Sequence, residues 1–94
     1  MSRSTIFFRV HAVQRMFERG ISVKRVISVL ESGKTIEDYS SEMQDPSRLI
    51  LGFQGKHPLH VVISENQETN ELTVITVYTP NSDNWSKDFK SRRA

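Results

Sequence analysis

The chain has 94 residues, a formal net charge of +2 and no cysteine. This length suits a single domain, and the lack of cysteine excludes disulfides, cysteine-ligated zinc and a thiol nucleophile. Small secreted domains usually need disulfides, and the first residues do not form a signal peptide, so we expect a cytoplasmic protein. No apolar run approaches the roughly 20 residues of a membrane helix, so we expect no membrane span.

The first part of the chain predicts two short helices. Over residues 8–19, apolar residues recur at helical spacing: Val10, Val13, Met16 and Phe17. Gly20 then suits a left-handed C-cap, and Ser22 is a good N-cap for a second helix that ends at Gly33. We expect Val13, Met16 and Phe17 to pack on a sheet and Arg15 to stay outside the core.

After Gly33 the apolar period changes to two, which predicts four strands, over residues 34–40, 48–53, 59–64 and 72–79, with a polar loop over 41–46. The last strand is the strongest. One face is predicted to hold Leu72, Val74, Thr76 and Tyr78, and the other Thr73, Ile75, Val77 and Thr79. Both faces hold β-branched or aromatic residues, so we expect a central strand that is covered at least partly on both sides.

The predicted fold class is therefore α+β, with two N-terminal helices followed by a four-stranded, mostly antiparallel sheet. The whole chain is expected to be one domain, with its core at about 8–86 and a basic C-terminal tail at 87–94. Trp85 is expected to anchor the closing segment.

The helix predicted over residues 8–19 carries a charged side. His11, Arg15 and Arg19 are spaced i, i+4 and i+8, so they stack along that side. Arginine can bind phosphate through a bidentate fork, and histidine can move a proton near neutral pH. The alternative interpretation is a solvent-exposed helix face with an ion pair to Glu18, since charged residues are usual on helix surfaces.

Two histidines lie near the start of the third predicted strand. His57 and His60 are three residues apart and would face opposite sides of a strand, and no third ligand follows at metal-site spacing, so we expect no metal site and no cofactor. His60 is expected on a sheet face opposite Tyr78 or Thr76, either as a functional group or as a partly buried histidine that a neighbour satisfies.

One run resembles a known sequence motif. Residues 11–22 read HAVQRMFERGIS, which resembles H-A-x-x-R-M-x-E-R-G-I-S, the hallmark of a bacterial family of domains of unknown function of about this length. Residues 75–80 (ITVYTP), Trp85 and the basic run at 89–93 resemble the closing pattern of that family. The likeness spans about 8–93.

The resemblance implies a fold similar to that of the RelE-like and BrnT-like ribonuclease toxins. Those toxins cleave RNA without a metal ion, through scattered basic and aromatic residues. The resemblance also implies pairing with a small antitoxin that carries a zinc-finger domain, as for some members of the family of domains of unknown function. RNA and a small antitoxin are therefore the expected partners.

The first hypothesis is a toxin-like, metal-independent endoribonuclease. Such cleavage needs a base, an acid and cations on the phosphate. His11 would transfer protons, Arg15 and Arg19 would hold the phosphate, and Tyr78 or His60 would be the second proton-transfer or base-stacking group. Lys90, Arg92 and Arg93 would bind the RNA backbone. The alternative is a module that binds RNA or protein without catalysis.

Overall fold

The computed structural model describes residues 5–39, 46–66 and 68–93. The elements are, in chain order, β1 (Thr5–Phe8), α1 (Val10–Arg19), α2 (Val23–Ser32), β2 (Lys34–Asp38), β3 (Ser47–Gln54), β4 (His57–Asn66) and β5 (Glu71–Tyr78). Residues 40–45, where the sequence predicts the end of a strand and a polar loop, lie outside the described part, as does residue 94 at the end of the predicted tail.

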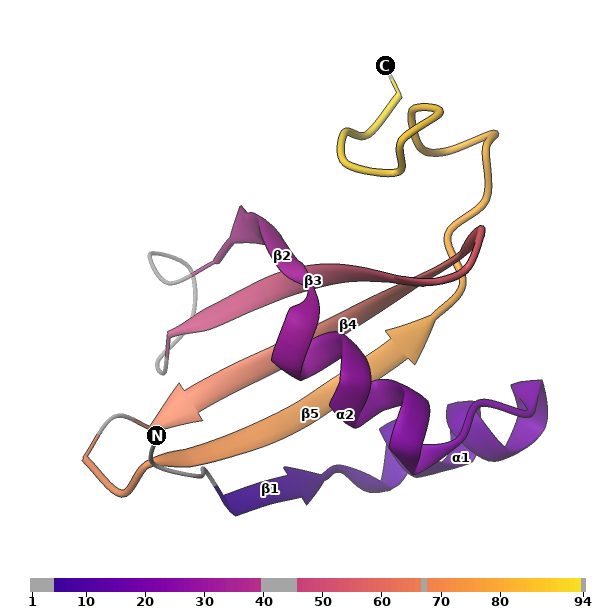
Figure 1. The fold of residues 1–94 in the computed structure, drawn as a ribbon. Coiled ribbons are helices and arrows are strands. Elements are labelled where there is room, and N and C mark those ends of the chain that lie inside the picture. The colour runs from indigo at the N-terminus through magenta and orange to yellow at the C-terminus, as the bar shows by residue number, and fades with distance from the viewer. Residues whose placement is uncertain (1–4, 40–45, 67, 94) are drawn as a thin grey trace.

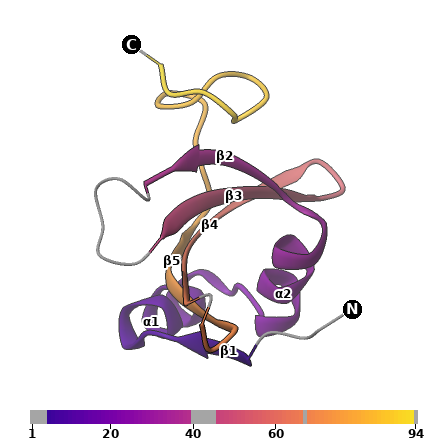
Figure 2. The ribbon, with the colours of Figure 1, turned by 90° about the vertical axis from the view of Figure 1, so that its left-hand side faces the viewer.

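One sheet contains all five strands, in the order β1-β5-β4-β3-β2. β1 runs parallel to β5, and the other neighbours are antiparallel. Figure 2 shows α2 within the curve of this sheet, and Figure 1 shows the segment after β5 rising above the strands to the C-terminus. The prediction of a central strand over 72–79 is confirmed in part, because β5 lies between β1 and β4 and not at an edge, while the middle strand is β4. No helix in the described ranges is long and apolar enough to cross a membrane.

The prediction of a four-stranded sheet missed β1, so the sheet has five strands and is mixed. Ile6 and Phe8 are half-buried and pack against the core, while Thr5 and Phe7 are exposed, which is the period-two pattern of a half-covered strand. Four residues are too few for that pattern to stand out beside a helix. The predicted helix start at residue 8 was wrong for the same reason, since α1 begins at Val10.

The predicted helix caps are confirmed. Gly20 is left-handed, with φ of 67°, and ends α1. The Ser22 hydroxyl accepts a hydrogen bond of 3.0 Å from the Arg25 amide at the start of α2. Only Ile21 and Ser22 lie between this glycine and α2, so the connection between the two helices is short.

The prediction of which α1 side chains are buried is only partly confirmed. Ala12 and Met16 are buried, whereas Val13 is 50% and Phe17 is 89% exposed. The helix is thus turned by about a quarter of a turn from the predicted apolar stripe. The side chain of Ala12 is small and fully buried, so a larger side chain at this position would push the helix away from the core. Arg15 lies outside the core, as predicted.

The main core lies between the helices and one face of the sheet. It includes Val26 and Val29 of α2, Ile50 of β3, and Val74 and Val77 of β5. Val74 and Val77 share this face because the pairing of β4 with β5 shifts at a bulge between Val62 and Ile63. The predicted faces of the last strand were therefore wrong, because strict alternation does not continue through a bulge.

The opposite face of the sheet is also covered. By alternation from Ile50, the buried residues Leu49 and Leu51 point to this second face, and His60 pairs with Leu51 and Tyr78 in the sheet register. The segment after β5 covers this face through Trp85, which is buried. The C-terminal segment thus forms a small second layer over the sheet face that the helices leave uncovered.

Candidate functional site

His60 is the centre of a polar cluster on the second sheet face. The residue is fully buried. Its Nδ1 lies 3.1 Å from the Tyr78 hydroxyl, and its Nε2 lies 2.9 Å from the backbone carbonyl of Phe89. A carbonyl can only accept, so Nε2 carries the hydrogen, and Nδ1 then accepts from the Tyr78 hydroxyl. Of the two residues expected opposite His60, Tyr78 and Thr76, the sheet register pairs it with Tyr78.

Aromatic rings enclose this imidazole. The Trp85 ring centroid lies 4.4 Å from that of His60 with the planes at 87°, and the Tyr78 ring lies at 5.1 Å and 71°. Burial lowers the pKa of His60 from its ordinary value of 6.5, although the Phe89 carbonyl and the charge of Glu37 act in the other direction. Burial raises the pKa of Tyr78. At neutral pH the pair therefore consists of a neutral imidazole and a protonated phenol.

An ion pair closes the cluster on the β2 side. Arg92 Nε donates to Glu37 Oε2 at 2.9 Å, and Arg92 Nη2 donates to Glu37 Oε1 at 3.1 Å. Tyr39 also donates its hydroxyl hydrogen to Glu37. The Arg92 hydrogen bond is the main reason why the pKa of Glu37 is lowered. The Arg92 guanidinium also lies 4.8 Å from the centroid of the Trp85 ring, a cation–π contact.

The C-terminal tail is held by contacts within itself as well as by its contacts with His60 and Glu37. Trp85 forms a bridge with Arg92, and the Arg93 amide donates to the Asn84 carbonyl at 2.9 Å. Arg93 Nε donates to the carbonyls of Ser82 and Trp85 at 2.6 and 2.7 Å. Residues 85–93 therefore fold back on themselves and do not extend away from the domain.

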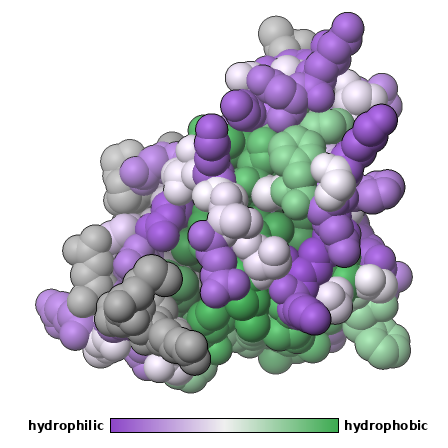
Figure 3. Space-filling model, in the orientation of Figure 1, coloured by the Kyte–Doolittle hydropathy of each residue, from purple (hydrophilic) through white to green (hydrophobic). Residues whose placement is uncertain are grey.

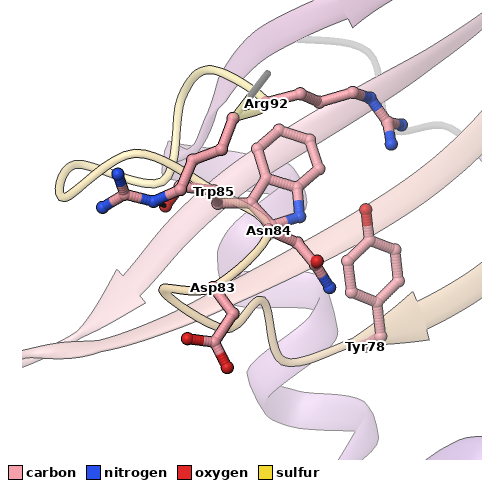
Figure 4. Close-up of a pocket in the computed structure, with 6 residues that line it drawn as sticks. Tyr78, Asp83, Asn84, Trp85 and Arg92 are labelled. Carbon is pink, nitrogen blue, oxygen red and sulfur yellow. Dashed lines mark hydrogen bonds between the residues drawn. The ribbon is translucent and has the colours of Figure 1, made fainter.

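An open polar cavity of about 620 Å³, which we call the tail pocket, lies beside this cluster. Its lining residues are Tyr78, Asp83, Asn84, Trp85, Arg92 and Arg93. In Figure 4 the side chain of Asn84 points toward Tyr78, while that of Asp83 points away from it. The tail pocket thus combines a hydroxyl that is hydrogen-bonded to a buried imidazole with two guanidinium groups at its wall.

The structure brings together only some of the candidate residues. Tyr78 and His60 form one pair, and Arg92 and Arg93 line the same pocket. Lys90 lines a different hollow, beside Phe53. The three α1 candidates, His11, Arg15 and Arg19, are exposed, and none of them lines the tail pocket. His57, at the start of β4, is exposed, and His60 is buried.

The sequence did not indicate several members of the cluster. Glu37 near the end of β2 and Tyr39 just after it are two residues apart, which is a weak signal that the two side chains could lie on the same side. Nothing in the sequence predicts the contact of the Phe89 carbonyl with His60. Phe89 has a left-handed backbone with φ of 61°, which is unusual for phenylalanine. Within the described residues, no group of three histidine, aspartate or glutamate side chains could hold a metal ion.

Comparison with known proteins identifies a family but not an activity. No curated protein and no solved structure matches the chain. A family model described as a domain of unknown function, DUF4258, matches residues 8–79. This range contains α1, α2 and four of the strands, together with His60 and Tyr78, and it ends before Trp85 and the rest of the tail. The chain therefore belongs to the DUF4258 family of domains of unknown function.

Proposed function

We propose that this protein is a metal-independent endoribonuclease that acts in the tail pocket. The observation that carries the proposal is the hydrogen bond from the Tyr78 hydroxyl to His60 Nδ1 at the wall of an open polar cavity. This places a half-buried tyrosine that lines the cavity in contact with a buried neutral base.

The hydrogen bond between Tyr78 and His60 would let two protons move together, one from a ligand to Tyr78 and one from Tyr78 to His60. An RNA 2′-hydroxyl that enters the pocket would give its proton to the Tyr78 oxygen while Tyr78 passes its own proton to His60 Nδ1. The 2′-oxygen would then form a bond to phosphorus, the bond from phosphorus to the 5′-oxygen would break, and the 5′-oxygen would take a proton from water. The products are a 2′,3′-cyclic phosphate and a 5′-hydroxyl. General base catalysis of this kind is worth about 10²- to 10⁴-fold in rate.

The phosphate would be held by groups of the tail. Arg92 is already paired with Glu37, so its charge is partly neutralised before RNA binds. Arg93 donates through Nε to two carbonyls and lines the pocket, which favours it as the main phosphate ligand. Asn84, which points toward Tyr78, supplies a neutral donor for the same phosphate (Figure 4).

We further propose that the protein is the toxin of a toxin–antitoxin pair. The motif at residues 11–22 resembles that of proteins related in fold to RelE-like and BrnT-like toxins, and we extend their fold, their cytoplasmic action and their pairing with a small antitoxin to this chain. The exposed Val10 and Phe17 on α1, beside His11 and Arg15, would suit an antitoxin segment that is apolar and acidic.

The test is RNA cleavage by purified protein in EDTA. Wild type is expected to cleave a labelled single-stranded RNA, and Tyr78→Phe, which removes only the hydroxyl, is expected to slow cleavage by about 10²-fold or more. His11→Ala is the matched control, because it removes an exposed histidine outside the pocket. Thermal melting of both variants checks that the fold is kept.

Two outcomes contradict the proposal. If His11→Ala stops cleavage and Tyr78→Phe does not, the active groups lie on α1, where the sequence first indicated them. If wild type cleaves no RNA, the second candidate is favoured, a module that binds RNA or protein without catalysis. The observation behind that candidate is the exposed α1 face, where His11, Arg15 and Arg19 form a basic surface on a helix instead of converging in a pocket.

A further inference from the structure

The end of β3 has an open edge beside α2. The pairing of β2 with β3 reaches only to Lys34 and Leu51, so the outer edge of residues 52–54 has no partner strand in the described part of the chain. α2 lies close to this edge, because a Cβ on Gly52 would be 2.7 Å from a methyl group of Val29. Two hollows, of about 290 and 350 Å³, lie along the edge and share Phe53.

We infer that these two hollows form one binding groove for single-stranded RNA, with Phe53 as its stacking platform. This Phe53 groove rests on the proposed function for its ligand, but its residues differ from those of the tail pocket. It would hold the RNA strand next to the residues that cleave it.

The charge of the groove is of one sign. Lys24 and Arg25 line the hollow near the start of α2, and Lys34 and Lys90 line the other. Among the described residues, no aspartate or glutamate lines either hollow. Cations on both sides of a central ring fit a ligand that carries a phosphate on each side of a base.

Arg25 is positioned by the protein. Its Nη2 donates to the carbonyls of His57 and Pro58 at 3.3 and 3.4 Å, which holds the side chain in place. Its Nε is buried and has no hydrogen-bond partner. An ordered guanidinium at the wall of this hollow loses little conformational freedom when it binds a phosphate oxygen.

The ring of Phe53 is available to a ligand. It is 51% exposed, and its centroid lies 6.5 Å from that of Phe89, with the planes tilted by 58°. Figure 3 shows hydrophobic surface exposed between hydrophilic side chains on the face of the molecule that carries α2. An exposed aromatic ring between cations is the arrangement that binds unpaired bases with little sequence preference.

Phe89 connects the groove to the tail pocket. Its ring is the neighbour of Phe53, and its carbonyl accepts the hydrogen bond from His60. Lys90, the next residue, lines the groove, while Arg92 and Arg93 line the pocket. A strand that stacks on Phe53 would therefore be directed by the tail toward Tyr78.

The test is binding of a fluorescent single-stranded RNA of about ten nucleotides, measured by anisotropy across a salt series. The RNA carries 2′-fluoro groups, so it cannot be cleaved and binding is measured alone. Phe53→Leu keeps an apolar side chain but removes the ring, and it is expected to weaken binding by about fivefold or more. The double variant Lys34→Gln, Lys90→Gln is expected to reduce the slope of log affinity against log salt by about 1.4.

Matched controls use the same changes elsewhere. Phe17→Leu removes an exposed ring on α1, and Lys87→Gln removes a tail cation that lines neither hollow; neither is expected to change binding. If Phe53→Leu and the lysine variant bind like these controls, or if wild type does not bind, the groove is overturned. Loss of binding in Phe53→Leu supports it even where wild type cleaves no RNA. Cleavage that depends on Tyr78 and is indifferent to Phe53 would overturn the groove and keep the proposed function.

Discussion

At the scale of single residues, His60 links the stability of the domain to pH. Burial lowers its pKa in the folded protein, so the unfolded chain binds a proton at a higher pH than the folded protein does. The stability that this neutral histidine contributes is therefore fully present above about pH 6.5 and is lost as the pH falls through its lowered pKa.

We predict that the free energy of unfolding of wild type falls between pH 7.5 and pH 5, as measured by urea denaturation. His60→Gln is expected to flatten this dependence and to cost about 1–3 kcal/mol at pH 7.5, because Tyr78 and the Phe89 carbonyl lose their partner. The carboxylate of Glu37, whose pKa is lowered, contributes below this window. The exposed His11→Gln variant is the control, and a flat wild-type profile would show that His60 is not the group that titrates.

At the scale of elements, the large apolar side chains of α1 are not the same set as its buried side chains. Ala12 is fully buried, while Phe17 is the most exposed of the large apolar residues in the described part of the chain. We predict that Ala12→Leu destabilises the domain by about 1–3 kcal/mol, because it forces α1 away from the sheet. Phe17→Ala is expected to change stability by less than about 0.5 kcal/mol.

The measurement is urea denaturation of both variants beside wild type. If the stripe predicted from the sequence were the buried one, the order would be reversed, and Phe17→Ala would cost about 3–5 kcal/mol. A large loss in Phe17→Ala with a stable Ala12→Leu variant would therefore reject the orientation of α1 described here.

The sequence predicted the regular elements better than their arrangement. The caps at Gly20 and Ser22 and the period change after Gly33 depend on local chemistry, so the two helices and the four longer strands were found. β1 was missed, because a four-residue parallel strand gains its stability from β5, which is far away in the sequence. The rotation of α1 depends on packing around Ala12, which no spacing rule describes.

The candidate site shows the same limit. The sequence left Tyr78 and Thr76 as possible partners opposite His60, and only the sheet register selects Tyr78. The ion pair of Arg92 with Glu37 joins residues 55 positions apart, and the Phe89 hydrogen bond depends on a left-handed backbone. Contacts of this kind follow from the path of the tail, which carries no periodic signal in the sequence.

At the scale of the whole molecule, the tail joins the two proposed surfaces. Residues 85–93 cover the sheet face that holds His60, line the tail pocket and contribute Lys90 to the Phe53 groove. The helices cover the other face and leave α1 with an exposed side for a partner. One small domain would thus bind RNA at the open end of β3, react at Tyr78, and meet a protein partner at α1.

The central claim is that Tyr78 and His60 remove the 2′-proton of RNA. The most direct test is the chemical form of the RNA ends, determined by mass spectrometry after wild-type protein has acted in EDTA. We predict a 2′,3′-cyclic phosphate on one fragment and a 5′-hydroxyl on the other. Tyr78→Phe is expected to form the same products far more slowly. A 3′-hydroxyl with a 5′-phosphate would contradict it, because those ends require water instead of the 2′-hydroxyl as the nucleophile.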